Sequence, residues 1–225
     1  MKQKNKIINQ RKELFTDPEL IILDMDGTIV IEPEFYRDIY SKSLYDTVFE
    51  ERGETGVGMI DYYRANFDNN GQFALMALAI PFSKWADKLS KSDLSGITPR
   101  FDIVEKTRQL NSKKIVFTGS PKKLAFKILS RFGFNPEKDF DAIIGWEEPE
   151  IWPIKWNCSS FVFQSICHRF QANPSNAWAI GDNWKTDLEP AQAIGIKTIQ
   201  IQRNSGTAEK YFEDFSSLLN NIERI

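Results

Sequence analysis

Residues 20–28 read Leu-Ile-Ile-Leu-Asp-Met-Asp-Gly-Thr, and this stretch decides the fold class. Its four apolar residues do not alternate with polar ones, and they end abruptly at Asp24. A short apolar run that ends in polar residues and a glycine is typical of a strand buried on both faces, as in a parallel sheet. The carboxyl end of such a strand brings Asp24 and Asp26 to the edge of the sheet where ligands bind.

Similar apolar runs recur along the chain, and each ends in small or polar residues. They cover residues 114–117, 142–144, 177–180 and 198–201. Between them the spacing of apolar residues becomes helical, which predicts helices over 124–132, 161–170 and 188–194. The alternation of strands and helices predicts an α/β fold with a doubly wound, mostly parallel Rossmann-like sheet.

Residues 31–99 interrupt this alternation and read as mainly helical. The helical patterns cover 35–51, 59–67, 72–78 and 82–89, with glycines, asparagines and a proline between them. We therefore expect two domains. An α/β core is formed by residues 1–30 and 100–225, and a helical domain of residues 31–99 is inserted after the first strand.

Composition and charge narrow the class of protein. The chain has 225 residues with 41% hydrophobic and 27% charged residues, close to the average of soluble globular proteins. Its net charge of -2 gives no electrostatic basis for binding a nucleic acid polymer or an anionic membrane. The basic N-terminus precedes no apolar segment, and residues 73–82 are about half as long as a bilayer span, so we expect a cytoplasmic protein. The oligomeric state is left open.

Cysteine and histidine are too few for several kinds of site. If the predicted helix extends back to Cys158, it places Cys158 and Cys167 about 13 Å apart along its axis, too far for a disulfide. With His168 as the single histidine, these two thiols do not make a structural zinc site. We expect the chemistry to depend on carboxylates and lysines instead.

Polar residues follow several of the predicted strands at one edge of the sheet. They are Asp24 and Asp26 after the first strand, Thr118-Gly119-Ser120 after the second, Lys155 in a later loop, and Gly181-Asp182 with Asp187 after a further strand. Two carboxylates 4 Å apart repel each other by about 4 kcal/mol at an effective dielectric near 20. A hard cation relieves this repulsion, and ligands that are all oxygen suit Mg²⁺, which in turn recruits phosphate.

The same residues suit phosphoryl transfer. Lys155, the Thr118 hydroxyl and the backbone N–H groups around Gly119 are placed to hold phosphoryl oxygens. Asp24 is a competent nucleophile toward phosphorus, which predicts an aspartyl-phosphate intermediate. Asp26 then protonates the leaving alcohol and deprotonates water. The residues therefore predict hydrolysis of a phosphomonoester.

The set Asp24-x-Asp26-Gly-Thr28, Thr118, Lys155 and Gly181-Asp182-x-x-x-x-Asp187 resembles the motifs of the haloacid dehalogenase (HAD) superfamily, over about residues 18–205. The resemblance implies that Asp24 is the nucleophile, that Asp26 is the general acid and base, and that Thr118 and Lys155 bind phosphate. It also implies Mg²⁺ as cofactor, held by Asp24, the backbone carbonyl of Asp26, and Asp182. Asp187 is then either a further carboxylate of the metal site or one that contacts the metal ligands. The inserted helical domain then corresponds to a C1-type cap.

Several alternatives stay open. Lys155 is followed by Trp156 where the family usually has proline, so Lys122 or Lys123 is an alternative phosphate ligand. Residues 69–75 resemble pyrimidine 5′-nucleotidase-like members, which makes nucleoside monophosphates a candidate among small phosphate esters. A phosphotransferase or mutase of the same fold is the competing enzyme class. A non-enzymatic phospho-acceptor module is disfavoured because such modules lack an inserted domain.

Overall fold

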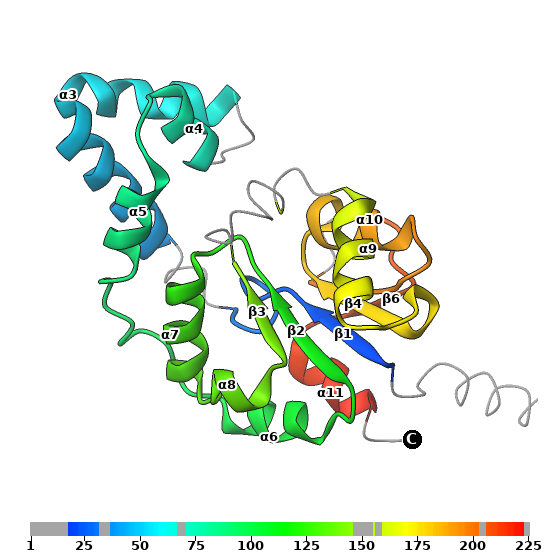
Figure 1. Ribbon diagram of the computed structural model, residues 1–225. Coiled ribbons are helices and arrows are strands. Elements are labelled where there is room, and N and C mark those ends of the chain that lie inside the picture. The colour runs from blue at the N-terminus through cyan, green and yellow to red at the C-terminus, as the bar shows by residue number, and fades with distance from the viewer. Residues whose placement is uncertain are drawn as a thin grey trace, which may run out of the picture. The chain divides into compact units, whose positions relative to one another are not determined.

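The computed structural model describes residues 18–31, 37–66, 71–145, 155, 159–202 and 206–222 (Figure 1). Contacts between Cα atoms divide the chain into two compact units. One unit comprises Met1–Ile31 and Pro99–Ile225, and the other comprises Glu32–Thr98. Among the helices of the described residues, none is long and apolar enough to cross a membrane.

The first unit is built on a six-stranded sheet in which every described pair of neighbouring strands is parallel. Its order is β3-β2-β1-β4-β5-β6. The strands are β1 (Leu20–Leu23), β2 (Lys113–Phe117), β3 (Ala142–Ile144), β4 (Ala177–Gly181), β5 (Lys197–Ile201) and β6 (Lys210–Phe212). The expected doubly wound α/β fold is confirmed, and β6 is a strand that the sequence analysis did not predict. The direction of strand addition reverses between β1 and β4, which is the switch point where such sheets bind ligands.

Burial on both faces of the sheet explains the uninterrupted apolar runs. All four residues of β1 are buried, although successive side chains point to opposite faces. On one face, Leu20 and Ile22 share a core cluster with Phe163 and Ile166 of α9 (Ser160–Arg169) and Ala191 of α10 (Glu189–Gln192). Leu23 is paired with Val116 of β2 and Ile180 of β4, so β1 ends one residue before these two strands.

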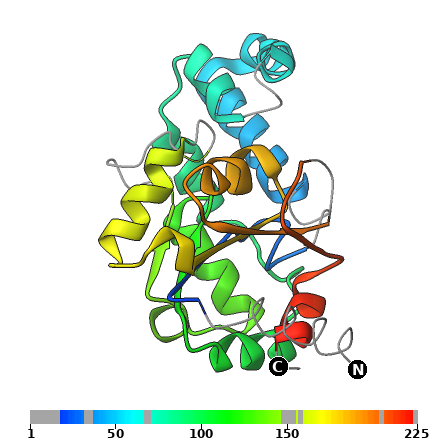
Figure 2. The same ribbon diagram turned by 90° about the vertical axis from the view of Figure 1, so that its right-hand side faces the viewer.

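The remaining helices of this unit include the one predicted over 124–132 and others that the sequence analysis did not predict. They are α6 (Phe101–Gln109), α7 (Lys122–Phe132), α8 (Pro136–Asp139) and α11 (Phe215–Ile222), together with the 3₁₀ helix η2 (Pro174–Asn176) and the π-helix η3 (Trp184–Leu188). Figure 2 shows them from a second direction. The predicted end of α7 is correct: Gly133 has φ +117°, and its N–H donates to Leu129 O. His168 is exposed and Cys167 is buried, whereas Cys158 lies outside the described residues.

The second unit contains helices in its described part: the π-helix η1 (Arg37–Ser41), α3 (Lys42–Asn66), α4 (Gly71–Ala77) and α5 (Phe82–Leu89). The expected separation of two helices by residues 52–58 is wrong in its extent. The helix is kinked at Gly53, where φ is +63° and ψ is -161°, and it continues through Gly56 and Gly58. Inside this unit, the Trp85 indole N–H donates to Ser43 Oγ at 2.9 Å.

Candidate active site

The candidate active site lies at the carboxyl end of β1, at the switch point between β1 and β4. The Asp24 N–H donates to Ile180 O of β4 at 2.8 Å, which extends the ladder by one residue and fixes the backbone of Asp24. The chain then turns back, because Ile29 N and Val30 N both donate to Met25 O. This turn requires φ +85° at Gly27, a conformation that favours glycine.

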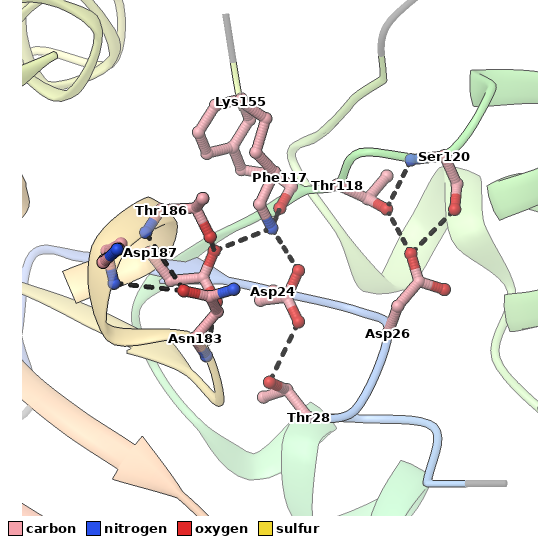
Figure 3. A network of polar contacts seen from close by, with 11 residues as sticks. Asp24, Asp26, Thr28, Phe117, Thr118, Ser120, Lys155, Asn183, Thr186 and Asp187 are labelled. Atoms are coloured by element: carbon pink, nitrogen blue, oxygen red, sulfur yellow. Dashed lines mark hydrogen bonds and ion pairs between the residues drawn. The ribbon is translucent and has the colours of Figure 1, made fainter. Parts of the chain in front are cut away.

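Each oxygen of the Asp24 carboxylate has a defined partner (Figure 3). Lys155 Nζ donates to Oδ1, and Thr28 Oγ1 donates to Oδ2 at 3.0 Å. Lys155 Nζ also donates to Phe117 O at 2.8 Å and lies 3.1 Å from Asp187 Oδ1. The structure therefore places Lys155 against Asp24, whereas Lys122 and Lys123 form the start of α7.

Asp26 is held apart from Asp24, on the side of β2. Its Oδ2 accepts hydrogen bonds from Thr118 Oγ1 at 2.9 Å and from Ser120 Oγ at 2.7 Å (Figure 3). Ser120 N donates in turn to Thr118 Oγ1 at 3.0 Å. Gly145, after β3, makes room for this loop, since a Cβ atom on Gly145 would lie 2.7 Å from Ser120 O. The two aspartates of the first motif thus occupy different environments.

Asp187 closes the other side of the site. Its Oδ1 accepts from Thr186 Oγ1 at 2.9 Å, and its Oδ2 accepts from Asn183 N at 3.1 Å. The Asn183 side chain accepts from the N–H groups of Lys185 and Thr186 and so begins η3. Space is tight here, because a Cβ atom on Gly181 would lie 2.5 Å from Asp187 Cβ.

Three carboxylates of the site are close enough to share a cation. One ligand oxygen from each of Asp24, Asp182 and Asp187 lies within 4.8 Å of the others. Asp24 and Asp187 are buried, and Asp182 is partly buried. All three donors are hard oxygen ligands, so the set fits a hard divalent cation better than a soft metal.

Burial and mutual repulsion shift the ionisation of these groups. Burial raises the pKa of Asp24 well above its ordinary value, against the attraction of Lys155, and the neighbouring carboxylates raise it further. Burial and the charge of Asp187 raise the pKa of Asp182 to about 6. Burial disfavours the charged form of Lys155, but Asp187 and Asp24 outweigh it and raise its pKa above the ordinary value. A cation bound here would relieve the excess negative charge.

The sequence-predicted residues form two neighbouring groups in the structure. Asp24, Lys155, Asp182 and Asp187 make one, and Asp26 with Thr118 makes the other, with Gly119 in the loop that follows. Sequence reasoning missed the side-chain roles of Thr28, Ser120, Asn183 and Thr186. Each of these residues has a hydroxyl or amide side chain and lies within four positions of a motif aspartate or of Thr118, which is the signal that could have found them. Spacing in the sequence alone does not show where such a side chain points.

One family model matches part of the chain. A family model described as HAD-hydrolase-like matches residues 158–216, which include β4, β5, Asp182 and Asp187. No curated protein sequence shows a significant match.

Solved structures match over almost their whole length. CbbY from Rhodobacter sphaeroides in complex with phosphate has a TM-score of 0.66 at 14% identity, covering 92% of this chain and 99% of CbbY. The putative HAD-hydrolase YfnB from Bacillus subtilis bound to magnesium has a TM-score of 0.62 at 16% identity, covering 92% and 100%. A putative β-phosphoglucomutase from Thermotoga maritima has a TM-score of 0.54 at 18% identity, covering 92% and 99%.

The fold and the family match together confirm the resemblance to the HAD superfamily. The family match agrees with the hydrolase class that the motifs predict, a phosphoric monoester hydrolase of the HAD type. The assignment to the branch with a C1-type cap stays a prediction. The likeness to pyrimidine 5′-nucleotidases also stays a prediction, and residues 69–70 of that stretch lie outside the described residues.

Proposed function

We propose that the protein is a Mg²⁺-dependent phosphomonoester hydrolase that acts on a small phosphorylated metabolite through an aspartyl-phosphate on Asp24. The observation that carries this proposal is the separation of Asp24 and Asp26. Asp24 is bound by Lys155 and Thr28, whereas Asp26 is bound by hydroxyl groups after β2. Carboxylates in distinct environments suit distinct roles as nucleophile and as acid.

In the first half-reaction, an Asp24 oxygen attacks phosphorus and the bond from phosphorus to the leaving oxygen breaks. Protonated Asp26 gives its proton to that oxygen, so the product leaves as an alcohol. In the second half-reaction, the Asp26 carboxylate takes a proton from water while the water oxygen attacks phosphorus. This step frees Asp24, returns the proton to Asp26 and releases inorganic phosphate.

The cation site is part of the proposal. Asp24, Asp182 and the backbone carbonyl of Asp26 would hold Mg²⁺, with the Asp187 carboxylate beside them and oriented by Thr186. When bound, the ion neutralises carboxylate charge and polarises a phosphoryl oxygen. The magnesium in the YfnB structure, which has the same fold, supports this cofactor.

Lys155 and nearby hydrogen-bond donors would bind the phosphate group of the substrate. Lys155 lies between β3 and α9 in the sequence, and its ammonium donates both to Asp24 and to Phe117 O at the end of β2, so it lies beside the attacking carboxylate. Together with the Thr118 hydroxyl and the Gly119 N–H, it is assigned to the phosphoryl oxygens. The phosphate bound to CbbY supports a site for this group in the shared fold. The Glu32–Thr98 unit, as a C1-type cap, would select the substrate, and nucleoside monophosphates are one class to test.

The test is the release of inorganic phosphate from a panel of nucleoside monophosphates and sugar phosphates, with Mg²⁺ and with EDTA. We expect Mg²⁺-dependent release from at least one class and none from Asp24→Asn. Isomerised sugar phosphate in excess over free phosphate would instead identify a mutase. A stable phosphoryl-aspartate without turnover would identify a phospho-acceptor module, and wild-type protein inactive on every class would contradict the proposal.

A further inference from the structure

Two hydroxyl groups donate to the same oxygen of Asp26. Ser120 Oγ lies 2.7 Å from Oδ2, and Thr118 Oγ1 lies 2.9 Å from it (Figure 3). Both donors are buried, each with 1% of its surface exposed. Two donors on one carboxylate oxygen occupy its two lone pairs, so a proton on this carboxyl group belongs on the other oxygen, Oδ1.

Thr118 cannot keep this contact while it serves a phosphate. A threonine hydroxyl has a single proton to donate. Thr118 Oγ1 already accepts from Ser120 N at 3.0 Å, and its own proton goes to Asp26 Oδ2. Under the proposed function, the Thr118 proton turns to a phosphoryl oxygen when substrate binds. Asp26 then loses one of the two donors that orient it.

Ser120 has a backbone that is anchored independently of the substrate. Thr118 N donates to Ile144 O of β3 at 3.0 Å, which continues the pairing of β2 with β3 into the loop. The Ser120 carbonyl lies against Gly145, where a Cβ atom would come within 2.7 Å. The loop that carries the Ser120 hydroxyl is therefore packed directly on the end of the sheet, a rigid base for positioning another side chain.

We propose that Ser120 is the positioning residue of the general acid. It keeps Asp26 Oδ2 occupied after Thr118 has turned to the phosphate, so that the proton of Asp26 stays on Oδ1 and is delivered to the leaving oxygen. Ser120 acts through Asp26 and does not contact the substrate. The proposal rests on the proposed function, because only that function gives Asp26 a proton to deliver.

The experiment compares two substrates that differ in their need for an acid. A primary alkyl phosphate needs protonation of its leaving oxygen, whereas p-nitrophenyl phosphate releases a stable phenolate. General acid catalysis contributes about 10²–10⁴-fold, and a lost positioning contact removes part of it. We therefore expect Ser120→Ala to lower kcat on the alkyl phosphate about 10-fold more than kcat on p-nitrophenyl phosphate. Ser120→Thr keeps the hydroxyl and should restore much of the ratio.

A double-mutant comparison separates positioning from a general structural effect. If Ser120 acts through Asp26, the pair Asp26→Asn/Ser120→Ala has the same alkyl-to-aryl ratio as Asp26→Asn alone. Equal losses on both substrates in Ser120→Ala, or an effect that adds to that of Asp26→Asn, would overturn the proposal. Failure of the proposed function gives a different result, because wild-type protein would then release no phosphate from either substrate. The positioning role of Ser120 would be contradicted as well.

Discussion

A Cβ atom built on Gly27 would lie 2.7 Å from Asp182 Oδ2, so the backbone that follows Asp26 is in close contact with the Asp182 carboxylate. Gly27 also has φ +85°, in the left-handed region that favours glycine. The close approach means that a side chain at Gly27 would push the Asp182 carboxylate aside, and the positive φ favours glycine independently.

Gly27→Ala should therefore displace Asp182 as well as strain the backbone. A non-glycine residue in this conformation costs about 1–3 kcal/mol, which corresponds to roughly 2–12 °C in the melting temperature of a chain this size. In addition, the stabilisation by Mg²⁺ should shrink. Thermal melts in EDTA and in millimolar Mg²⁺ measure both effects.

Gly195→Ala is the matched control. Gly195 has φ +86°, and an added Cβ would meet no atom within 4 Å. It should show a similar loss of melting temperature with an unchanged response to Mg²⁺. The contact with Asp182 would be irrelevant to the cation if the two variants responded to Mg²⁺ alike.

Saturating Mg²⁺ should stabilise the wild-type protein, because it neutralises the cluster of Asp24, Asp182 and Asp187. A ligand at 100 times its dissociation constant adds about 2.7 kcal/mol, or roughly 5–10 °C here. Asp182→Asn should weaken this response and raise the melting temperature in EDTA, since one like charge is gone. A response to Mg²⁺ that survives intact in Asp182→Asn would remove this residue from the cation site.

The raised pKa of Asp182 also predicts that the stability of the metal-free protein depends on pH. Its pKa is raised to about 6 in the folded state, above the ordinary value of 3.8, so the folded state holds the proton more tightly than the unfolded state. Its contribution to the free energy of unfolding is therefore present below about pH 4 and is lost as the pH rises through about 6. We expect the melting temperature in EDTA to fall over this window relative to Asp182→Asn. If the melting temperatures of the two proteins changed with pH in parallel, the raised pKa of Asp182 would be contradicted.

Lys155 should be essential for stability when the cation is absent. Its ammonium contacts Asp24 and Asp187, and all three side chains are buried. Removing one partner of a buried ion pair costs about 3–5 kcal/mol. Lys155→Met should therefore melt well below wild type in EDTA and gain more than wild type from Mg²⁺.

Lys123→Met is the control for that experiment, because Lys123 is an exposed lysine of α7 that was an alternative to Lys155 in the sequence. Its melting temperature should stay close to that of wild type, since most surface substitutions change stability by under about 0.5 kcal/mol. If Lys155→Met melted no lower than Lys123→Met, the buried ion pair would contribute nothing to the stability of the metal-free protein.

The sequence predicted the parts of the fold that have strong local signals. The strands β1 to β5 are buried runs with clear polar ends, and α7 ends at a glycine in the left-handed conformation. β6 was missed because its residues are only partly buried and show no apolar run. In the second unit, the sequence predicted two helices separated by glycines, whereas the helix is kinked at Gly53 and continues through Gly56 and Gly58, because a glycine costs a helix only about 1 kcal/mol.

The candidate site was predictable in its carboxylates and lysine but not in the hydrogen bonds that orient them. Motif spacing placed Asp24, Lys155 and Asp187 at one edge of the sheet. That Ser120 would turn its hydroxyl to Asp26 depends on the packing of its loop against Gly145, a contact between segments that sequence patterns do not reveal.

The proposed mechanism requires that Asp24 carries the phosphoryl group during turnover. The most direct measurement is peptide mass spectrometry of Asp26→Asn, quenched in acid after incubation with p-nitrophenyl phosphate and Mg²⁺. This substrate needs little acid catalysis to load the enzyme, whereas the missing base slows the attack of water, so the intermediate should accumulate. We expect one phosphoryl group on Asp24 and none in the pair Asp24→Asn/Asp26→Asn. A phosphoryl group on any other residue, present equally in both proteins, would contradict the proposed mechanism.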